Sequence, residues 1–285
     1  MTAQPRIAPQ IFRAYDIRGI VGAGLDESSI ELIGRVIGSE ALDQGERALL
    51  TAADARLSSP ALSRALLRGI LSTGCDVCDL GVVPTPLLYF GAEVLPIHSG
   101  VMLTGSHNPK EYNGIKIVLR QRALADGQIR QLQQRIEQDN FHHGAGAFTR
   151  HDINAAYIER IVSDIQFQKR WRVVLDAGNG VTGLVAPQLF TQLGCEVIPL
   201  YCELDGNFPH HHPDPSRADC LQDLRAAVLR HGADLGLAFD GDGDRIGLVS
   251  AQGDIIDTDH LLFAFVSDLL PRYPGARVVY DIKSS

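Results

Sequence analysis

Cysteine is scarce in this chain, and its five cysteines are scattered along 285 residues. A small domain held together by disulfides needs more cysteines at closer spacing, so a disulfide framework is excluded. Cys75 and Cys78 form one C-x-x-C, but residues three apart in a strand point to opposite faces, and no second C-x-x-C completes a zinc site. We therefore expect ordinary structural cysteines.

Long apolar runs and an excess of basic residues are also missing. The best apolar run, residues 261–266, is far shorter than the ~18 residues of a membrane-spanning helix. Residues 1–9 contain no apolar stretch that resembles a secretory signal. With 26 Lys and Arg against 34 Asp and Glu, the net charge of −8 repels nucleic-acid phosphates and anionic lipid. These absences predict a cytoplasmic protein with no nucleic-acid or membrane partner.

The chain does contain a regular alternation of short aliphatic runs and helical patterns. Its length and its 45% hydrophobic residues allow about two cores. The alternation predicts the α/β class with mixed, mostly parallel sheets. The first cycle has predicted strands at 49–52, 77–80, 100–103 and 115–119, and helices at 60–72 and 85–93. The second has strands at 173–176, 196–200, 235–239 and 246–249, and helices at 183–193 and 218–230.

A glycine-rich stretch at 139–149 separates the two cycles, and a helical pattern at 153–165 follows it. We expect one domain over 1–145 and a second over 152–253. After Gly253 a third pattern begins, with a predicted helix at 259–270 and a strand at 277–282. One helix and one strand cannot bury a sheet, so residues 254–285 are expected to be the truncated start of a further domain.

The segment Asp240-Gly-Asp-Gly-Asp-Arg245 follows directly on an apolar strand, where open α/β sheets bind ligands. Its glycines allow a tight turn, so Asp240, Asp242 and Asp244 can converge on one hard cation that offsets their repulsion. An EF-hand needs Gly and Glu where Arg245 and Ala251 stand, so a calcium sensor is excluded. An aspartyl-phosphate enzyme stays an alternative, because it also places two Asp in this spacing after a strand.

A second polar loop, Leu103-Thr-Gly-Ser-His-Asn-Pro-Lys110, also follows a strand, and Ser106 is its candidate nucleophile. It is not a hydrolase elbow, because Thr104 and Asn108 stand where that motif needs glycines. We expect the side chains of Ser106 and His107 to diverge, since neighbours in an extended segment point apart. This argues against a Ser–His triad.

Two further segments add cations and a phenol. The segment Tyr112-Asn-Gly-Ile-Lys-Ile-Val118 places Lys116 at the start of a strand, and Phe12-Arg-Ala-Tyr-Asp-Ile-Arg-Gly19 brings Tyr15 and Arg18 into one turn-rich stretch. Neither is diagnostic alone, because surface lysines and structural arginines are common.

Together, the motifs FRAYDIRG, TGSHNP with NGIK, GNFPHHHPDP and DGDGDR closely resemble those of the α-D-phosphohexomutases, in particular the phosphomannomutase/phosphoglucomutase branch. The resemblance covers essentially the entire chain and implies successive α/β/α domains. It also implies a phosphotransferase that interconverts hexose 1-phosphate and hexose 6-phosphate, of mannose or glucose, through a hexose 1,6-bisphosphate. A small sugar phosphate is the implied partner, and no oligomeric state is predicted.

The resemblance identifies Ser106 as a phosphoserine that donates and recovers the phosphoryl group. Its phosphate oxygen is then a ligand of Mg²⁺ together with Asp240, Asp242 and Asp244. The physical chemistry agrees, because a phosphoserine of about −1.5 to −2 charge beside three carboxylates needs a divalent ion and nearby cations.

The remaining site residues are carried over in the same way. His107 and Lys116 match positions implicated in acid/base work and in positioning at the transferred phosphate. Arg245 matches the arginine that ends the metal loop, and Arg18 and Tyr15 match residues of the active cleft. We expect Arg18 and Arg245 to act in catalysis and Tyr15 to bind substrate.

The chain departs from the family pattern at several positions. Ala53 stands before Asp54-x-Arg56, where the family usually has glycine, so this turn must form without one. The histidines at 210–212 could bind zinc, but consecutive residues flanked by prolines do not easily converge on one ion, so we predict a structural loop. The sugar-recognising and phosphate-gripping loops of the family's third and fourth domains have no counterpart here. Two alternatives follow: a catalytically impaired fragment that only binds metal and sugar phosphate, and a phosphoglucosamine mutase.

Overall fold

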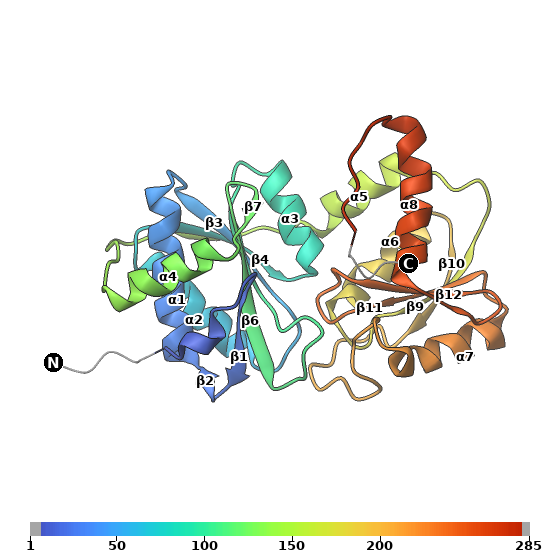
Figure 1. The fold of residues 1–285 in the computed structure, drawn as a ribbon, viewed down its shortest axis with the longest axis horizontal. Helices are drawn as coiled ribbons and strands as arrows, with labels where there is room; N and C mark the ends of the chain where they lie inside the picture. Colours follow the sequence, from blue (N-terminus) through green and yellow to red (C-terminus); the bar gives the residue numbers. More distant parts are fainter. Residues whose placement is uncertain (1–6, 281–285) are drawn as a thin grey trace.

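The computed structural model describes residues 7–280, and its N-terminal half is built around one mixed sheet (Figure 1). The strands of this sheet are β1 (Ile17–Val21), β2 (Gly24–Leu25), β3 (Ala48–Ala53), β4 (Asp76–Val82), β5 (Gly100–Leu103), β6 (Tyr112–Leu119), β7 (Arg122–Ala123) and β8 (Phe148–Arg150). Their order is β2-β1-β6-β5-β3-β4-β8, with β7 paired to β6. β3 runs parallel to β4 and β5, whereas β6 runs antiparallel to β5 and β1.

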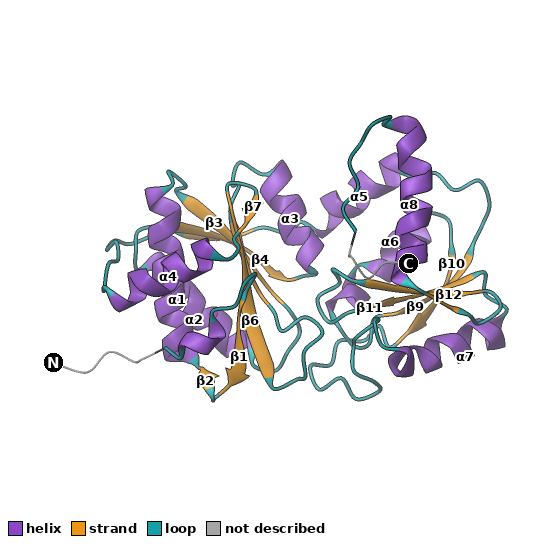
Figure 2. Ribbon diagram, in the orientation of Figure 1, coloured by secondary structure: helices purple, strands orange, loops and turns teal. Residues whose placement is uncertain are grey.

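Helices cover both faces of this sheet (Figure 2). Leu49 and Leu50, neighbours on β3, belong to different cores, because successive side chains of a strand point to opposite faces. The core around Leu49 includes residues of α1, α2 and α4, and the core around Leu50 includes residues of α3. The helices are η1 (Pro9–Ile11), α1 (Glu27–Asp43), α2 (Ser59–Leu71), α3 (Thr85–Val94) and α4 (Gly127–Glu137).

Two glycines allow α1 and α2 to cross closely. A Cβ at Gly34 would lie 2.4 Å from the carbonyl oxygen of Leu66, and one at Gly69 would lie 2.1 Å from that of Glu31. Any larger residue would push the two helix backbones apart. The sequence pattern predicts α2 and α3, whereas α1 and α4 were not predicted. Asp26 caps α1 by accepting the N–H of Ser29 at 2.8 Å.

The C-terminal half forms a second mixed sheet in the order β10-β9-β11-β12-β13. β9 runs parallel to β10 and β11, and β12 runs antiparallel to β11 and β13. The α6 face is packed around Leu175 and the α7 face around Val174. The elements are α5 (Asn154–Asp164), β9 (Arg172–Asp176), η2 (Val181–Leu184), α6 (Ala186–Gln192), β10 (Glu196–Leu200), η3 (Ala218–Leu221), α7 (Gln222–His231), β11 (Leu235–Phe239), β12 (Ile246–Ser250) and β13 (Ile255–Ile256).

The predicted α/β class with successive α/β/α layers and mixed sheets is confirmed, and parallel pairing predominates in the first sheet. Two predicted helices differ in detail. The helix expected at 183–193 is split into η2 and α6, and the helix expected at 218–230 is split into η3 and α7.

The glycine-rich stretch between the two sheets packs against the first of them. β8 pairs in parallel with β4, and the N–H groups of Gly144 and Gly146 donate to Ser72 and Leu71 carbonyl oxygens, both at 2.9 Å. Beyond this stretch α5 shares a core with α3, where the rings of Phe90 and Tyr157 meet edge to face at 5.4 Å. The two sheets are therefore joined by apolar packing as well as by the chain.

The last helix, α8 (Thr258–Arg272), has no buried residue, and Phe263 is 71% exposed. The predicted strand at 277–282 is wrong over 277–280, where the backbone pairs with no other strand, and residues 281 and 282 lie outside the described part of the chain. Over residues 7–280, no helix has the length and apolar character needed to cross a membrane.

Candidate functional site

Ser106 lies in the loop that follows β5 and is 1% exposed. Its backbone φ of +49° lies in the left-handed region. Its Oγ donates a hydrogen bond to Asp240 Oδ2 at 2.6 Å and lies 3.2 Å from His107 Nδ1. The predicted divergence of Ser106 and His107 is therefore wrong, because it assumed an extended backbone that the positive φ replaces.

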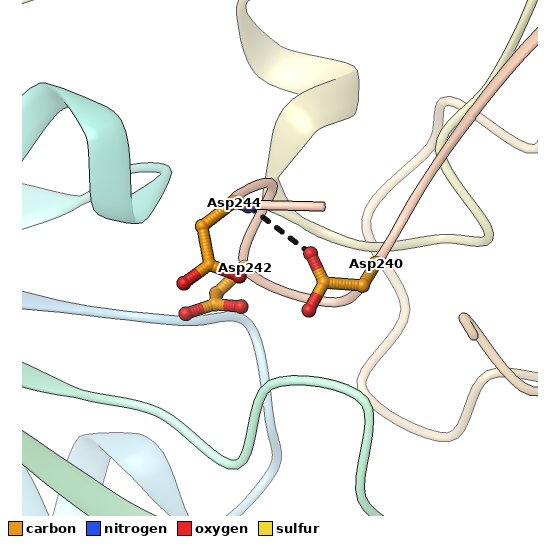
Figure 3. Close-up of side chains that lie close together, drawn as sticks. All are labelled: Asp240, Asp242 and Asp244. Atoms are coloured by element: carbon orange, nitrogen blue, oxygen red, sulfur yellow. Dashed lines mark hydrogen bonds between the residues drawn. The ribbon is translucent and has the colours of Figure 1, made fainter. Parts of the chain in front are cut away.

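Asp240, Asp242 and Asp244 converge in the loop between β11 and β12 (Figure 3). One carboxylate oxygen from each lies within 4.8 Å of the other two. Asp240 and Asp242 are 0% exposed, and Asp244 is open to solvent. The N–H of Asp244 donates to Asp240 Oδ1 at 3.1 Å, which closes the loop on itself (Figure 3). The structure thus brings the three carboxylates together, and their role as ligands stays a prediction.

The glycines of this loop permit two close approaches. A Cβ at Gly241 would lie 2.6 Å from the carbonyl oxygen of Ser106. Gly243 has a φ of +74°, and a Cβ there would lie 2.3 Å from Thr182 Oγ1. Because Gly241 carries no side chain, the loop after β11 can touch the loop after β5 through backbone atoms.

Lys116 on β6 and Thr85 at the start of α3 contact the same carboxylates from the N-terminal half of the chain. Lys116 Nζ lies 2.6 Å from Asp242 Oδ2 and 2.5 Å from Asp244 Oδ2. Thr85 Oγ1 donates to Asp242 Oδ2 at 2.5 Å, and its N–H donates to the Asp242 carbonyl at 2.8 Å. Burial lowers the pKa of Lys116, but the two carboxylates outweigh burial, so its pKa lies above the ordinary value. Lys116 is therefore an ammonium shared between two carboxylates.

Burial and neighbouring charges shift the pKa values of the two buried carboxyl groups, Asp240 and Asp242, in opposite directions. Burial raises the pKa of Asp240 to about 8, and the charges of Asp242 and Asp244 add to the effect. Burial also favours the neutral form of Asp242, but Lys116 and the hydroxyl of Thr85 outweigh it and lower the pKa of Asp242. Without a divalent ion, the cluster therefore relieves its repulsion by keeping a proton on Asp240.

The cluster fits a hard divalent cation. Asp242 Oδ1 is buried and accepts no hydrogen bond from any described residue. The available donors are carboxylate oxygens with a serine oxygen beside them, which is the donor set that Mg²⁺ prefers. Asp240, Asp242 and Asp244 could hold such an ion, with an oxygen on Ser106 next to it.

A cavity of about 480 Å³ opens beside Ser106 and gathers most of the predicted site residues. Arg18 pairs with Asp16 through Nη2, while its Nε is buried and has no partner among residues 7–280. His107 does not line the cavity, and burial, then the charge of Arg245, lower its pKa. The cavity carries an excess of cationic side chains, which suits an anionic ligand. The lining residues include Arg13, Tyr15, Asp16, Arg18, Tyr89, Ser106, Lys116, Asp244 and Arg245.

Several residues of this site were not predicted from the sequence. Thr85 and Tyr89 lie on α3, where the helical pattern gave no sign of a role. His212 lies in the loop between β10 and η3, and its Nε2 lies 2.5 Å from the carbonyl oxygen of His107. Arg56 contacts the Ser106 carbonyl oxygen at 2.7 Å. Only the Asp54-x-Arg56 pattern gave any signal, and it indicated no contact.

The departures from the family pattern have simple structural accounts. Ala53 ends β3 without a positive φ, next to an irregularity in the β3–β4 register, so no glycine is needed. His210, His211 and His212 bind separately to Asn179, Asp176 and the His107 carbonyl, as expected of a structural loop. Over residues 7–280, Asp240, Asp242 and Asp244 form the one cluster with metal-ligand geometry.

The cysteines take no part in the site. All five are free, as the sequence predicts. Cys75 is buried, which raises the pKa of its thiol to about 12 and leaves it unreactive.

Comparison with known proteins adds independent information. Residues 9–143 match the family model described as phosphoglucomutase/phosphomannomutase, alpha/beta/alpha domain I, and residues 155–253 match domain II of the same family. The phosphomannomutase/phosphoglucomutase of Pseudomonas aeruginosa is 52% identical over 279 residues, which cover 98% of this chain and 60% of that protein. The phosphoglucomutase of Neisseria gonorrhoeae is 46% identical over 98% of this chain and 61% of its own.

A crystal structure of a phosphoglucomutase/phosphomannomutase family protein from Burkholderia thailandensis has the same fold. The TM-score is 0.95 at 46% identity, over 98% of this chain and 62% of that one. The chain therefore spans about 60% of the length of the relatives that it matches.

Proposed function

Because the chain belongs to the phosphoglucomutase/phosphomannomutase family, we propose that it interconverts hexose 1-phosphate and hexose 6-phosphate of glucose, mannose or both. The reaction proceeds through a phosphoserine at Ser106 and a hexose 1,6-bisphosphate. The observation that carries the proposal is the 2.6 Å hydrogen bond from Ser106 Oγ to Asp240, made where three carboxylates and Lys116 meet. Clusters of charged groups with shifted pKa values are typical of functional sites and not of an ordinary serine loop.

In the proposed chemistry, Ser106 Oγ attacks a phosphorus atom of the bisphosphate. The new Oγ–P bond forms as the bond from phosphorus to the sugar oxygen breaks. The serine proton passes to His107 Nδ1, which lies 3.2 Å from Oγ, because Asp240 is needed as a carboxylate ligand of the metal. Lys116 is held as an ammonium by Asp242 and Asp244, so it is suited to protonate the departing sugar oxygen rather than to act as a base.

The surrounding cations position the substrate. Arg18 and Arg245 line the cavity beside Ser106, where they would bind phosphate oxygens, and Tyr15 would contact the sugar. Mg²⁺, held by Asp240, Asp242, Asp244 and an oxygen on Ser106, would neutralise the charge of the transferred phosphoryl group. His107, with its lowered pKa, would be neutral at pH 7 and accept a hydrogen bond near Ser106.

We also propose that residues 254–285 begin a third domain, after a first domain over 1–145 and a second over 152–253. The absence of any buried side chain on α8 supports this division, as does the greater length of the relatives. A chain without the rest of that domain would lose part of its grip on the sugar. The second candidate is therefore a fragment that binds metal and sugar phosphate but turns over poorly.

The decisive experiment supplies the chain with Mg²⁺, glucose 1-phosphate or mannose 1-phosphate, and a catalytic amount of glucose 1,6-bisphosphate. Turnover of about 1–10³ s⁻¹ supports the mutase and contradicts the impaired fragment. A chain that becomes phosphorylated but converts no monophosphate supports the fragment. Glucosamine 1-phosphate, tested in parallel, decides whether the chain is a phosphoglucosamine mutase instead.

The nature of the phosphoenzyme tests Ser106 directly. Incubation with glucose 1,6-bisphosphate should add the mass of one phosphate, stable in acid and absent from Ser106→Ala. A label that hydroxylamine removes and that disappears in Asp240→Asn would instead identify an aspartyl phosphate and overturn the assignment.

A further inference from the structure

Arg56 donates hydrogen bonds to the Ser106 loop through both terminal nitrogens of its guanidinium group. Its side chain is 0% exposed and lies outside the cavity that Ser106 lines. Nη2 donates to the carbonyl oxygens of Ser106 and Asn108, both at 2.7 Å. Nη1 donates to those of Pro109 at 2.6 Å and Tyr112 at 3.0 Å. One side chain thus fixes four carbonyl groups of the segment that carries the nucleophile.

Asp54 completes this arrangement from the end of β3. Its Oδ2 accepts Arg56 Nε at 3.1 Å, the Gly105 N–H at 3.0 Å and Thr104 Oγ1 at 3.0 Å. Its Oδ1 accepts Ser59 Oγ at 2.6 Å. Asp54 thus binds the start of the loop, at Thr104 and Gly105, and Arg56 binds its later part. The packing is close, because a Cβ at Gly105 would lie 2.3 Å from the Arg56 guanidinium.

The loop needs this support because of the conformation of Ser106. A non-glycine residue with φ of +49° is strained, and it persists only where its surroundings over-determine it. Arg56 Nη2 donates to the Ser106 carbonyl oxygen, and Gly241 lies so close to the same oxygen that a Cβ there would be 2.6 Å from it. The direction of the Ser106 side chain follows from the peptide groups on either side of it, so Arg56 sets where Oγ points.

We propose that Arg56 is the positioning residue for the nucleophile: its guanidinium fork holds the Ser106 loop in the strained conformation that aims Oγ at Asp240. The inference rests on the proposed phosphoserine chemistry. It requires a fork, not only a charge, because four carbonyl oxygens and a carboxylate occupy all five donor positions. A lysine offers one nitrogen and cannot replace these contacts.

Arg135 offers a matched control in the same half of the chain. Its side chain is 12% exposed, its Nε donates to Asn140 O at 2.7 Å, and Nη1 pairs with Glu40 and Asp43. It makes a comparable network on α4 but contacts no residue of the Ser106 loop. Arg135→Lys should therefore lower Tm and leave the Ser106 loop as it is.

The experiment compares Arg56→Lys, Arg135→Lys and the unaltered chain. The rate of Ser106 phosphorylation by glucose 1,6-bisphosphate is measured by intact mass under single-turnover conditions. For Arg56→Lys we expect the rate at saturation to fall about 10²-fold, since a misplacement of about 1 Å has this effect. The half-saturating bisphosphate concentration should change less than about threefold. Hydrogen exchange of the amides at 105–112 should accelerate in Arg56→Lys and not in Arg135→Lys.

An unchanged phosphorylation rate and unchanged hydrogen exchange in folded Arg56→Lys would overturn the proposal. The proposal would also fail if Arg56→Lys and Arg135→Lys, at equal Tm, lost the same fraction of the phosphorylation rate. If the unaltered chain accepts no phosphate, the proposed function fails and the exchange comparison alone decides the positioning role. If Arg56→Lys does not fold, Asp54→Asn takes its place. It keeps the side-chain volume and removes the charge that orients Arg56, so a wild-type rate and exchange in this variant would equally refute the proposal.

Discussion

The raised pKa of Asp240 predicts that the metal-free chain becomes less stable as the pH rises from about 4 to about 8. The perturbation is Asp240→Asn, which keeps the size of the side chain and one oxygen for the N–H groups of Asp244 and Arg245 but cannot ionise. In the unaltered chain, Asp240 ionises near 3.8 when unfolded and at about 8 when folded. Between these values only the folded state keeps the proton, so unfolding releases it.

The size of the effect follows from this difference in proton binding. Each pH unit inside the window removes at most about 1.4 kcal/mol of stability, and none is removed below the unfolded pKa. For a cooperative unit of this size, that corresponds to roughly 3–6 °C in Tm per pH unit. Asp240→Asn should lack this slope, so the difference between variant and wild type isolates Asp240 from the histidines that titrate in the same range.

The assay is thermal unfolding in EDTA at intervals from pH 4 to pH 8, followed by circular dichroism. The Tm of wild type should fall relative to Asp240→Asn as the pH rises, and Mg²⁺ should raise the wild-type Tm most at pH 8. Calorimetry in buffers of different ionisation enthalpy should detect up to about one proton released per Mg²⁺ bound near pH 7. A flat or rising difference in EDTA would show that Asp240 is ionised without metal and would refute the reasoning.

Three other substitutions test single contacts. Lys116→Met removes the ammonium between Asp242 and Asp244, so the Mg²⁺ affinity measured by calorimetry should tighten by about tenfold, or about 1.4 kcal/mol. Phosphorylation of Ser106 should slow in the same variant. Weaker Mg²⁺ binding would show that the ammonium does not compete with the ion. Gly241→Ala places a Cβ 2.6 Å from the Ser106 carbonyl and should slow phosphorylation by about 10²-fold, with unchanged kinetics counting against the backbone contact. Gly69→Ala should reduce the free energy of unfolding in urea by about 1–3 kcal/mol, because its Cβ would lie 2.1 Å from the Glu31 carbonyl. Gly127→Ala, with open space around the new Cβ, is the control for both glycine variants and should be neutral.

The sequence predicted the strands that build the two sheets better than it predicted their surroundings. β3, β5, β9 and β11 are short aliphatic runs between turn signals, and such runs are visible without tertiary information. α1 was missed although Asp26 caps it, and its burial depends on Gly34 meeting Gly69 thirty-five positions away in sequence. The strand expected at 277–280 has the right residues but no neighbouring strand to pair with.

In the candidate site, too, the features that depend on local sequence were predicted and those that depend on tertiary contacts were missed. The convergence of Asp240, Asp242 and Asp244 could be predicted from the sequence, because it depends on their spacing and on the intervening glycines, which are local properties. The contact of Ser106 with His107 depends on a positive φ that a serine rarely adopts, so extended geometry was the wrong assumption. The contacts of Arg56 with the Ser106 loop could not be predicted from the Asp54-x-Arg56 pattern, since they join segments that lie about fifty residues apart along the chain.

The glycines between the two sheets limit how these halves can be exchanged with those of relatives. A Cβ at Gly146 would lie 2.0 Å from the Cys75 carbonyl, so this stretch is glycine-rich for close packing and not for freedom of movement. A chimera joined inside it would divide β8 from its pairing with β4. A crossover just after Arg150 would leave the first sheet whole, provided that Phe90 and Tyr157 are inherited as a compatible pair. The junction at which these halves can be exchanged is therefore the three residues between β8, which ends at Arg150, and α5, which begins at Asn154, and packing sets this limit.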